Sequence, residues 1–175
     1  MRLIAVTRPD FYAEEPLQIV SLLKNGFEKV HVRKPESRVE DMTKLLDEIP
    51  MEYREKLVLH DHHELAETYG VKGVHLNQRN PLPPVGFKGS LSASCHSLEE
   101  IPSALEHCDY VFLSPIFDSI SKAGYQAKFT VEELEKADLT NVFALGGVTF
   151  DKIPELRKLG FTGAALHGAL WHKNS

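Results

Sequence analysis

Two side chains with obvious chemistry, His31 and Arg33, occupy alternate positions in one short apolar segment. Side chains two positions apart point to the same face of a β-strand, so the imidazole and the guanidinium should lie together. Arg33 suits a diphosphate because its planar guanidinium can donate two parallel hydrogen bonds to phosphate oxygens. The alternative role for Arg33 is a structural salt bridge.

A run of four titratable residues, His60, Asp61, His62 and His63, raises the question of a metal. Imidazoles favour zinc, whereas a carboxylate that shares a cation with phosphate oxygens favours magnesium. If Asp61 points to the inner face of a strand, alternation turns His60 away, so the four cannot all bind one ion. His62 and His63 are expected at the start of a helix, in solvent. Asp61 is then either a Mg²⁺ ligand through a bound diphosphate or a helix N-cap.

Glycines follow two later apolar segments, as Gly146-Gly147 and as Gly168. A helix is expected to begin just after the glycine pair, near residues 149–151. Backbone N–H groups in such a turn can approach a phosphate closely, and a helix N-terminus favours the negative charge. The pattern predicts a phosphate site at Gly147 and Gly168. The alternative is two tight turns without a ligand.

A long loop after residues 110–113 contains two hydroxyls and an ammonium group, from Ser119, Ser121 and Lys122. This combination suits an oxyanion, and loops of this length in a compact domain often carry function. The alternative is an ordinary solvated loop.

All these candidates lie at or near the ends of short apolar segments. Eight such segments, typical of parallel strands covered on both faces, occur at residues 3–6, 30–32, 57–59, 73–76, 91–94, 110–113, 142–145 and 163–166. Helical patterns between them indicate parallel βα units. Eight units favour an α/β fold of the (β/α)8 TIM barrel type, in which functional groups gather at the C-terminal ends of the strands. The alternative is an open doubly wound sheet.

Helical periodicity and end signals predict five helices, at residues 16–25, residues 38–49, from Ser97, from Thr130 and at residues 151–159. Ser97 and Thr130 each begin a capping-box sequence, with a glutamate three positions later. The fourth helix is expected to be short or missing because residues 81–84 read Pro-Leu-Pro-Pro. The eighth is expected to be short or missing because the chain ends soon after the last strand. A homodimer could cover the barrel surface that this leaves.

The composition limits the functional class. A length of 175 residues predicts a single domain over residues 1–175. The net charge of −5 argues against a nucleic-acid coat protein, which needs a clustered positive field. No apolar run reaches the roughly 18–20 residues of a membrane span, and the charged first fifteen residues argue against a signal peptide. Two cysteines provide no disulfide framework, so we expect a cytoplasmic protein that binds neither nucleic acid nor membrane.

Several of these segments occur in an order and spacing that resemble the thiamine phosphate synthase and TenI family of (β/α)8 barrels. The resemblance runs from about Leu3 to Leu170 and rests on Val30-His31-Val32-Arg33, Leu59-His60-Asp61, Gly73-Val74-His75-Leu76-Asn77-Gln78, Ser94-Cys95-His96-Ser97-Leu98-Glu99-Glu100, Asp109-Tyr110-Val111-Phe112-Leu113-Ser114-Pro115-Ile116-Phe117, Ser121-Lys122 and Leu145-Gly146-Gly147-Val148-Thr149. For a synthase, it implies a transferase of thiamine (vitamin B1) biosynthesis. Such an enzyme joins hydroxymethylpyrimidine diphosphate to thiazole phosphate, releases diphosphate and uses Mg²⁺. The TenI branch instead tautomerises a thiazole carboxylate phosphate.

The resemblance also implies roles for residues that match the family's motifs. It implies catalytic roles for Arg33, Lys122 and His31. It implies contacts with substrate or phosphate for Arg33, His60, Ser94, Ser119, Ser121, Lys122, Gly147 and Gly168. The metal would lie on Asp61, which matches the first magnesium aspartate, with Asn80 as a weaker ligand.

Four positions depart from the synthase pattern. Pro35 stands where the family has a lysine, and Asn80 stands where the second magnesium aspartate is expected. His60 replaces an asparagine. Gly168 replaces a serine but still offers a backbone amide. The first two departures remove a leaving-group contact and a metal carboxylate, so a synthase of this sequence should be slow.

The TenI pattern is also incomplete. His31 replaces a glutamine of the synthases and looks similar to the TenI branch, but the TenI histidine after the sixth strand would fall at Pro115. A tautomerase needs a proton shuttle, for which His31, His96 and His167 are the candidates. Three functions therefore stay open: a synthase, a tautomerase, and a barrel that binds thiazole or thiamine phosphate without turnover.

Overall fold

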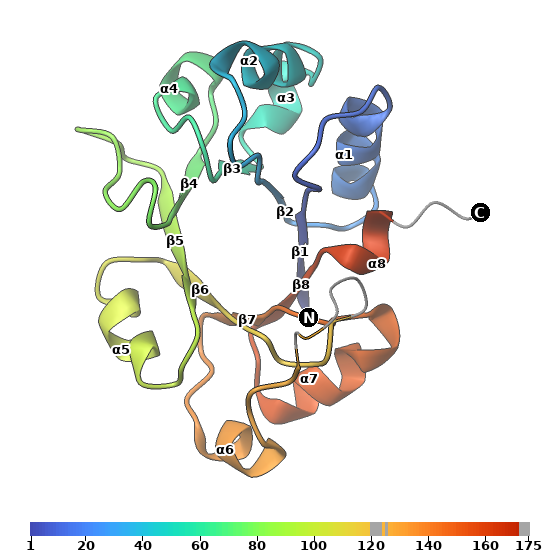
Figure 1. Ribbon diagram of the computed structural model, residues 1–175, viewed down its shortest axis with the longest axis vertical. Coiled ribbons are helices and arrows are strands. Elements are labelled where there is room, and N and C mark those ends of the chain that lie inside the picture. The colour runs from blue at the N-terminus through green and yellow to red at the C-terminus, as the bar shows by residue number, and fades with distance from the viewer. Residues whose placement is uncertain (120–123, 125, 172–175) are drawn as a thin grey trace. The chain divides into compact units, whose positions relative to one another are not determined.

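The computed structural model describes residues 1–119, 124 and 126–171 (Figure 1). Its eight strands form a closed barrel in the order β1 to β8, and the paired strands are parallel. The strands are β1 (Arg2–Val6), β2 (Lys29–Val32), β3 (Leu57–Leu59), β4 (Gly73–Leu76), β5 (Ser90–Cys95), β6 (Tyr110–Leu113), β7 (Val142–Ala144) and β8 (Gly163–Leu166). The predicted (β/α)8 barrel is confirmed, and each predicted strand is off by at most one residue at either end.

Helices follow most of the strands. They are α1 (Glu15–Lys24), α2 (Val39–Asp47), α3 (Met51–Arg54), α4 (Leu65–Tyr69), α5 (Glu100–Leu105), α6 (Val131–Lys136), the 3₁₀ turn η1 (Phe150–Lys152), α7 (Ile153–Leu159) and α8 (Gly168–Trp171). Residues 77–89 between β4 and β5 are all described and contain no helix, and α8 is only four residues long. The short or missing fourth and eighth helices are thus confirmed. None of the described helices has the length and apolar character needed to cross a membrane.

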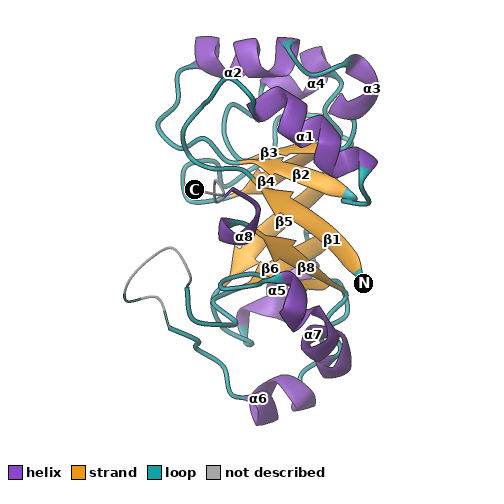
Figure 2. Cartoon of the chain, turned by 90° about the vertical axis from the view of Figure 1, so that its right-hand side faces the viewer, coloured by secondary structure: helices purple, strands orange, loops and turns teal. Residues whose placement is uncertain are grey.

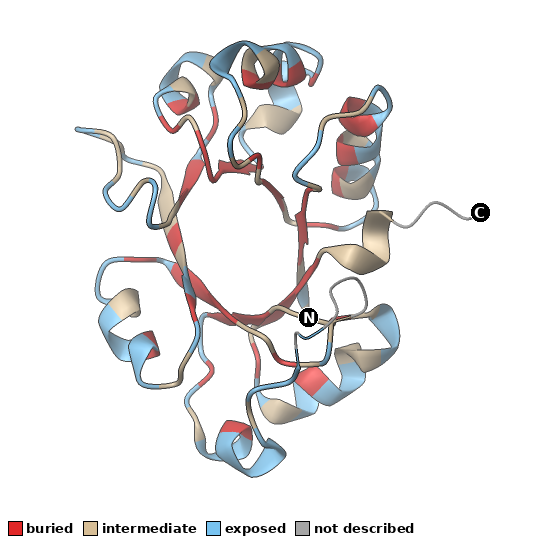
Figure 3. Cartoon of the chain, viewed as in Figure 1, coloured by how far each residue is buried: buried red, intermediate tan, exposed pale blue. Residues whose placement is uncertain are grey.

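Contacts within the chain define two compact units. The first consists of residues 5–92. In it, Val30 and Val32 of β2 pair with Leu57 and Leu59 of β3, and all four side chains are fully buried. Helices α2, α3 and α4 lie on the outer side of these strands (Figures 1 and 2), and the buried positions follow the strands (Figure 3). That residues 1–175 form a single domain stays a prediction.

The second unit consists of residues 1–4 and 93–175. Its core contains Phe112 of β6 opposite Phe143 of β7, both buried. Phe143 in turn pairs with Gly163 of β8, where an added Cβ would lie 2.3 Å from the Phe143 ring. Only a glycine lets the aromatic side chain fit at this point of the core.

Helix ends in the second unit show which local signals decide. The Thr130 hydroxyl accepts from the Glu133 N–H (3.2 Å), and the Glu133 carboxylate accepts from the Thr130 N–H (2.7 Å), so the capping box predicted there is confirmed. The capping box predicted at Ser97 is wrong. Helix α5 begins at Glu100, whose carboxylate instead accepts from the backbone N–H of His96 (2.8 Å).

Candidate functional site

Polar side chains collect at the ends of β2, β3 and β4 within residues 5–92. Arg33 follows β2, Asp61 lies two residues after β3, and Asn77 follows β4. The carboxyl ends of neighbouring parallel strands lie on the same edge of a sheet, which is where barrels carry their functional groups. A polar pocket of about 200 Å³, called the Asp61 pocket below, is lined by Lys34, Glu36, Ser37, Asp61, His62, Glu64, Arg79 and Asn80.

The carboxylate of Asp61 is fully engaged. Its Oδ2 accepts from the backbone N–H of Lys34 (2.9 Å), and its Oδ1 lies 3.0 Å from Arg79 Nε and 2.9 Å from Arg79 Nη2. The Asp61 side chain is only 8% exposed, whereas that of Arg79 is 44% exposed. Asp61 is not a helix N-cap, because α4 begins at Leu65 with Glu64 in the N-cap position.

The turn that carries Arg79 is built around one amide side chain. The Asn77 Oδ1 accepts from the backbone N–H groups of Arg79 and Asn80, each at 3.0 Å. The Asn77 Nδ2 donates to the His60 carbonyl (2.8 Å), and so does the Asn80 Nδ2 (3.3 Å). These bonds fix residues 77–80 against the end of β3, so the Arg79 side chain is directed at Asp61.

These residues do not fit a magnesium site of the family's kind. Mg²⁺ is usually held by one or two carboxylates together with substrate phosphates. Here the one carboxylate of the pair, Asp61, already bears the cationic Arg79, which would repel a second cation. The other position holds Asn80, which is uncharged and uses its amide N–H on a backbone carbonyl. The magnesium prediction stays a prediction that this geometry argues against.

Arg33 is held in place through its backbone. Its N–H donates to the hydroxyl of Thr7 (2.9 Å), and that hydroxyl donates back to the Arg33 carbonyl (3.4 Å). Thr7 is fully buried, while Arg33 is half-buried. The backbone is thus fixed next to β2, and none of the ion pairs found among the described residues includes Arg33.

The next residue, Lys34, is fully buried. Its ammonium group donates to the carbonyls of Arg8 (2.8 Å) and Asp10 (2.6 Å) and forms an ion pair with the buried Glu15. Burial lowers the pKa of Lys34 and raises the pKa of Glu15, although each residue partly offsets the other's shift. Lys34 therefore ties residues 8–15 to the end of β2 while its backbone N–H holds Asp61.

Three buried histidines from β2, β4 and the end of β3 form a cluster, called the histidine cluster below. His31 Nδ1 and His60 Nε2 are 2.8 Å apart, the His60 and His75 rings stack with centroids 4.1 Å apart, and His75 Nδ1 lies 2.8 Å from the Ser92 hydroxyl. Burial lowers the pKa of His31 and His60 well below the usual value and lowers the pKa of His75 to about 3. All three imidazoles are therefore neutral at physiological pH.

Nitrogens of the three rings lie within 4.8 Å of one another, a spacing that a metal ion could bridge. The charges around the cluster argue against a dication. Lys29 lowers the pKa of His31, and Arg33 lowers the pKa of His60 and His75, which shows that positive charge lies close to all three rings. A buried divalent ion would add to this positive charge with no carboxylate in the ligand set.

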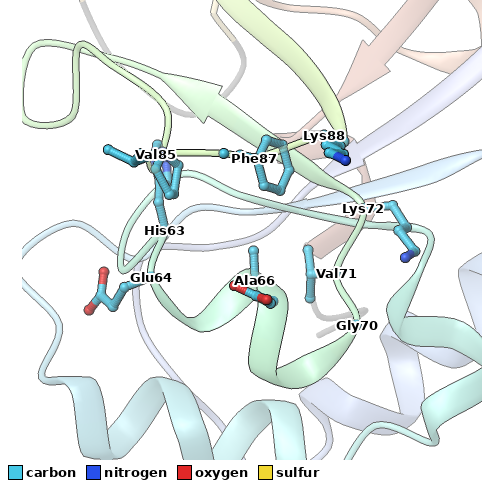
Figure 4. A pocket seen from close by; sticks show the side chains of 13 residues that line it. His63, Glu64, Ala66, Gly70, Val71, Lys72, Val85, Phe87 and Lys88 are labelled. Atoms are coloured by element: carbon cyan, nitrogen blue, oxygen red, sulfur yellow. The ribbon is translucent and has the colours of Figure 1, made fainter.

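The four-residue run at His60 does not act as one group. His60 belongs to the histidine cluster, whereas His62 Nε2 lies 2.9 Å from the Ser37 carbonyl. His63 is buried, and burial lowers its pKa. It lines a separate pocket of about 390 Å³ with Phe87 and other residues of the loop before β5 (Figure 4). The expectation that His62 and His63 begin a helix in solvent is wrong.

In the second unit, Gly147 adopts a left-handed backbone conformation with φ of +62°. A Cβ at this position would lie 2.1 Å from the Asp118 carbonyl oxygen, so the close approach of two backbone segments requires glycine here. The Gly147 carbonyl accepts from Lys152 Nζ (3.0 Å). The tight-turn interpretation is thus supported. A phosphate on the Gly147 amide stays a prediction.

The other predicted residues of the second unit occupy separate local settings. Ser94 is an exposed residue of β5, Ser119 is half-buried, and Gly168 is the first residue of α8. Ser121 and Lys122 lie outside the described residues. Their predicted roles stay predictions.

Sequence reasoning missed three residues of this region: Lys34, His75 and Arg79. The family pattern places its lysine one residue after Lys34, at Pro35. Arg79 directly precedes Asn80, the position at which the resemblance implies a metal carboxylate. His75 could have been predicted, because its position in β4 places its side chain on the same face of the sheet as those of His31 and His60.

Comparison with known proteins places these features in context. The model of a family described as thiamine monophosphate synthase matches residues 3–170. "Putative thiamine-phosphate synthase 2" of Aquifex aeolicus is 31% identical over 176 residues, which cover 94% of this chain and 94% of that protein. "Thiamine-phosphate synthase" of Photorhabdus laumondii is 27% identical and is aligned over 87% of this chain and 76% of its own length.

Solved structures agree with these matches. The crystal structure of thiamine phosphate pyrophosphorylase from Bacteroides thetaiotaomicron is 39% identical, with a TM-score of 0.88 over 100% of this chain and 87% of that one. Thiamine phosphate pyrophosphorylase from Pyrococcus furiosus has a TM-score of 0.77 at 19% identity and covers 99% of this chain and 89% of its own. The second likeness shows a shared fold.

Proposed function

Because this chain belongs to the thiamine monophosphate synthase family, we propose that it is a transferase of thiamine biosynthesis. The proposed reaction joins hydroxymethylpyrimidine diphosphate to thiazole phosphate and releases diphosphate. The observation that carries the proposal is the match over residues 3–170, together with the 39% identity to a thiamine phosphate pyrophosphorylase of known structure. Phosphorylated small molecules are the partners that such a reaction requires.

The proposed chemistry is a substitution at the pyrimidine methylene carbon. The bond from this carbon to the diphosphate oxygen breaks, and the electron pair leaves with the diphosphate. The ring nitrogen of the thiazole donates its lone pair to the cationic methylene, so that a carbon–nitrogen bond forms and the product carries a thiazolium charge. The protein's task is to neutralise the departing anion and to position the two partners.

From residues 5–92, the proposal assigns the departing diphosphate to Arg33. Its backbone is fixed by two hydrogen bonds with Thr7, and its half-buried guanidinium is able to bind two phosphate oxygens. A fixed cation at a strand end costs little reorganisation when charge develops on the leaving group. None of these steps depends on the predicted Mg²⁺.

From the second unit, the proposal assigns phosphate contacts to Ser94, Ser119 and the amides of Gly147 and Gly168. The support for Gly147 is local: its left-handed backbone and its contact with residue 118 fix the direction of the turn. Ser121 and Lys122 complete the proposed set as further contacts to the leaving group.

The tautomerase alternative is weakened by the state of His31. General acid–base catalysis works best when the pKa of the shuttling group lies near the working pH. Burial holds the pKa of His31 well below its usual value, and the ring is in contact with His60. His31 is therefore a poor proton shuttle at neutral pH, and its proposed contribution is to the packing of the cluster beneath Arg33.

The test is product formation by the purified chain with both substrates, measured as thiamine phosphate by liquid chromatography. Replacement of Arg33 by methionine should lower the rate about 10- to 100-fold, because a charge-assisted contact contributes about 1.5–3 kcal/mol. Arg38→Met is the matched control, since Arg38 is an exposed arginine paired only with Asp41. The control should retain the full rate.

Two results would contradict the proposal. If the wild-type chain makes no thiamine phosphate under any metal condition, it is not a synthase. If thiazole phosphate then still raises its melting temperature, the chain is a binding protein without turnover. Formation of a thiazole tautomer that persists in EDTA would instead support the isomerase.

We propose further that the protein acts in the cytoplasm as a homodimer. The two cysteines, Cys95 and Cys108, are both free and buried, which fits a reducing compartment. The dimer is proposed because α8 has only four residues with which to cover the last strand. Sedimentation of the full chain at several concentrations tests the dimer, and a single monomeric species would contradict it.

A further inference from the structure

We propose that the Arg79 guanidinium, bound to Asp61, takes the place of a magnesium ion in this chain and binds a substrate diphosphate directly. The inference rests on the proposed function, because it concerns how the leaving group of that reaction is held. It extends the proposal by assigning a diphosphate ligand that the family resemblance does not contain.

The first support is the occupancy of the Asp61 carboxylate. One oxygen accepts from the Lys34 backbone N–H, and the other lies within 3.0 Å of two nitrogens of Arg79. A cation already lies against Asp61, and it belongs to the protein.

The second support is the balance of charge. Two aspartates with one Mg²⁺ carry no net charge, and Asp61 with Arg79 carries none either. Asn80 is uncharged where the family resemblance implies an aspartate, so this pair of positions has one negative charge fewer, and Arg79 supplies a positive charge beside Asp61. The loss of the second carboxylate and the presence of an arginine are thus consistent changes in one turn.

The third support is the geometry of the turn at residues 77–80. Asn77 accepts from the backbone N–H groups of both Arg79 and Asn80, and it donates to the His60 carbonyl. This turn positions the Arg79 backbone rigidly, as expected for a residue that must meet a ligand at a fixed place.

The fourth support is the unused hydrogen-bonding capacity of Arg79. A guanidinium has five N–H donors, and only Nε and Nη2 face Asp61. The side chain is 44% exposed and lines the Asp61 pocket of about 200 Å³. The remaining donors are available to a phosphate that enters this pocket. Lys34, which directly follows Arg33, contacts the same carboxylate, so the two arginines are linked through Asp61.

The experiment is calorimetric titration of inorganic diphosphate into the full chain, in EDTA and in excess Mg²⁺. The wild-type protein should bind in EDTA, and Mg²⁺ should change its affinity by less than about threefold. Arg79→Gln should weaken binding in EDTA about tenfold or more, as expected for loss of a charge-assisted contact. The control Arg38→Gln should bind like the wild type, and melting curves should show that each variant is folded.

A double variant sharpens the test. In Arg79→Gln/Asn80→Asp the second carboxylate returns and the arginine is gone, so binding should be weak in EDTA and should recover about tenfold in Mg²⁺. The inference is overturned if the wild-type protein binds diphosphate only with Mg²⁺, if it binds under neither condition, or if Arg79→Gln leaves binding in EDTA unchanged. Even if a variant fails to fold, wild-type binding that requires Mg²⁺ overturns the inference.

The outcome is separable from that of the proposed function. Diphosphate binding that depends on Arg79 but not on metal, in a chain that makes no thiamine phosphate, would support the inference and refute the synthase. Thiamine phosphate formation that needs Mg²⁺ would support the synthase and refute the inference.

Discussion

Two neighbouring polar groups in residues 5–92 are held in opposite states. The histidine cluster of His31, His60 and His75 is neutral, because burial lowers the pKa of each ring. A few residues away, the ion pairs of Asp61 with Arg79 and of Lys34 with Glu15 have their charges in direct contact. The two groups meet at residues 60 and 61, which are adjacent in the chain.

The difference teaches what decides whether a buried titratable group is charged. The histidines have one another, a serine hydroxyl and nearby cations among their neighbours, and burial together with these cations disfavours a positive charge on the rings. Lys34 has two carbonyls and a carboxylate around its ammonium group. The charge state of a buried group therefore depends on the number of its polar contacts and on their charge, more than on burial alone.

The largest effect is expected from breaking the buried ion pair. Lys34→Met leaves Glu15 buried without its cation, which should lower the free energy of unfolding by about 3–5 kcal/mol. Urea denaturation followed by circular dichroism measures this change. The double variant Glu15→Gln/Lys34→Met removes both charges and should regain a large part of the loss.

The control for this prediction is Lys136→Met. Lys136 pairs with Glu132 on an exposed face of α6, so its loss should cost less than about 0.5 kcal/mol. Equal losses for Lys34 and Lys136 would show that the buried pair contributes no more than a surface pair.

The second prediction concerns acid. A histidine whose pKa is lowered in the folded state stabilises the fold above its unfolded pKa of about 6.5 and loses that stability as the pH falls. Between pH 7.5 and 5.5, each histidine of the cluster should remove about 1.4 kcal/mol from the free energy of unfolding. Glu15 has the opposite effect, because its raised pKa lets the folded state take up at most one proton there as the pH falls, which favours folding.

The measurement is a series of urea denaturations across this pH range. His75→Gln should flatten the dependence by about one histidine's share, because burial places the pKa of His75 at about 3 in the fold. A stability that stays level from pH 7.5 to 5.5 would mean that the cluster can accept protons while folded.

A smaller effect is expected from Asp61→Asn. This change keeps the shape but removes the charge that faces Arg79 and one of the two acceptor oxygens, so the amide cannot accept from both the Lys34 N–H and Arg79. Because the pair with Arg79 is partly exposed, the loss of stability should be only about 1.5 kcal/mol. Asp41→Asn, at the exposed pair with Arg38, is the matched control and should cost less than about 0.5 kcal/mol. If the two variants lose equal stability, Asp61 does not organise the strand ends.

The sequence was most informative where local physics decides the structure. Parallel strands buried on both faces must be apolar, so all eight were recognisable from short runs such as residues 57–59 and 110–113. The capping box at Thr130 forms, and the Glu133 carboxylate accepts from the Thr130 N–H and hydroxyl. At Ser97 the same signal failed, since Glu100 accepts from the His96 N–H instead.

The site was less predictable because long side chains choose partners that are distant in sequence. Arg79 reaches back 18 positions to Asp61, and Lys34 reaches 19 positions to Glu15. The prediction that His60 and Asp61 point to opposite faces of a strand also did not identify their roles. Strand β3 ends at Leu59, so Asp61 lies beyond the strand. The His60 side chain lies on the same face of the sheet as that of His31 and contacts it, whereas the Asp61 side chain contacts Lys34 and Arg79.

The smallest effect is expected from a change beside the neutral histidine cluster. Ser92→Ala removes the hydroxyl that lies 2.8 Å from His75 Nδ1 and should lower the free energy of unfolding by about 1 kcal/mol. Ser103→Ala, at an exposed position of α5, should change stability by less than about 0.5 kcal/mol. Nitrogen chemical shifts of the imidazoles should show a change at His75 in the Ser92 variant alone. Because a serine hydroxyl can serve a neutral ring as donor or acceptor, unchanged shifts would mean that the ring's protonation is fixed by its histidine neighbours and not by Ser92.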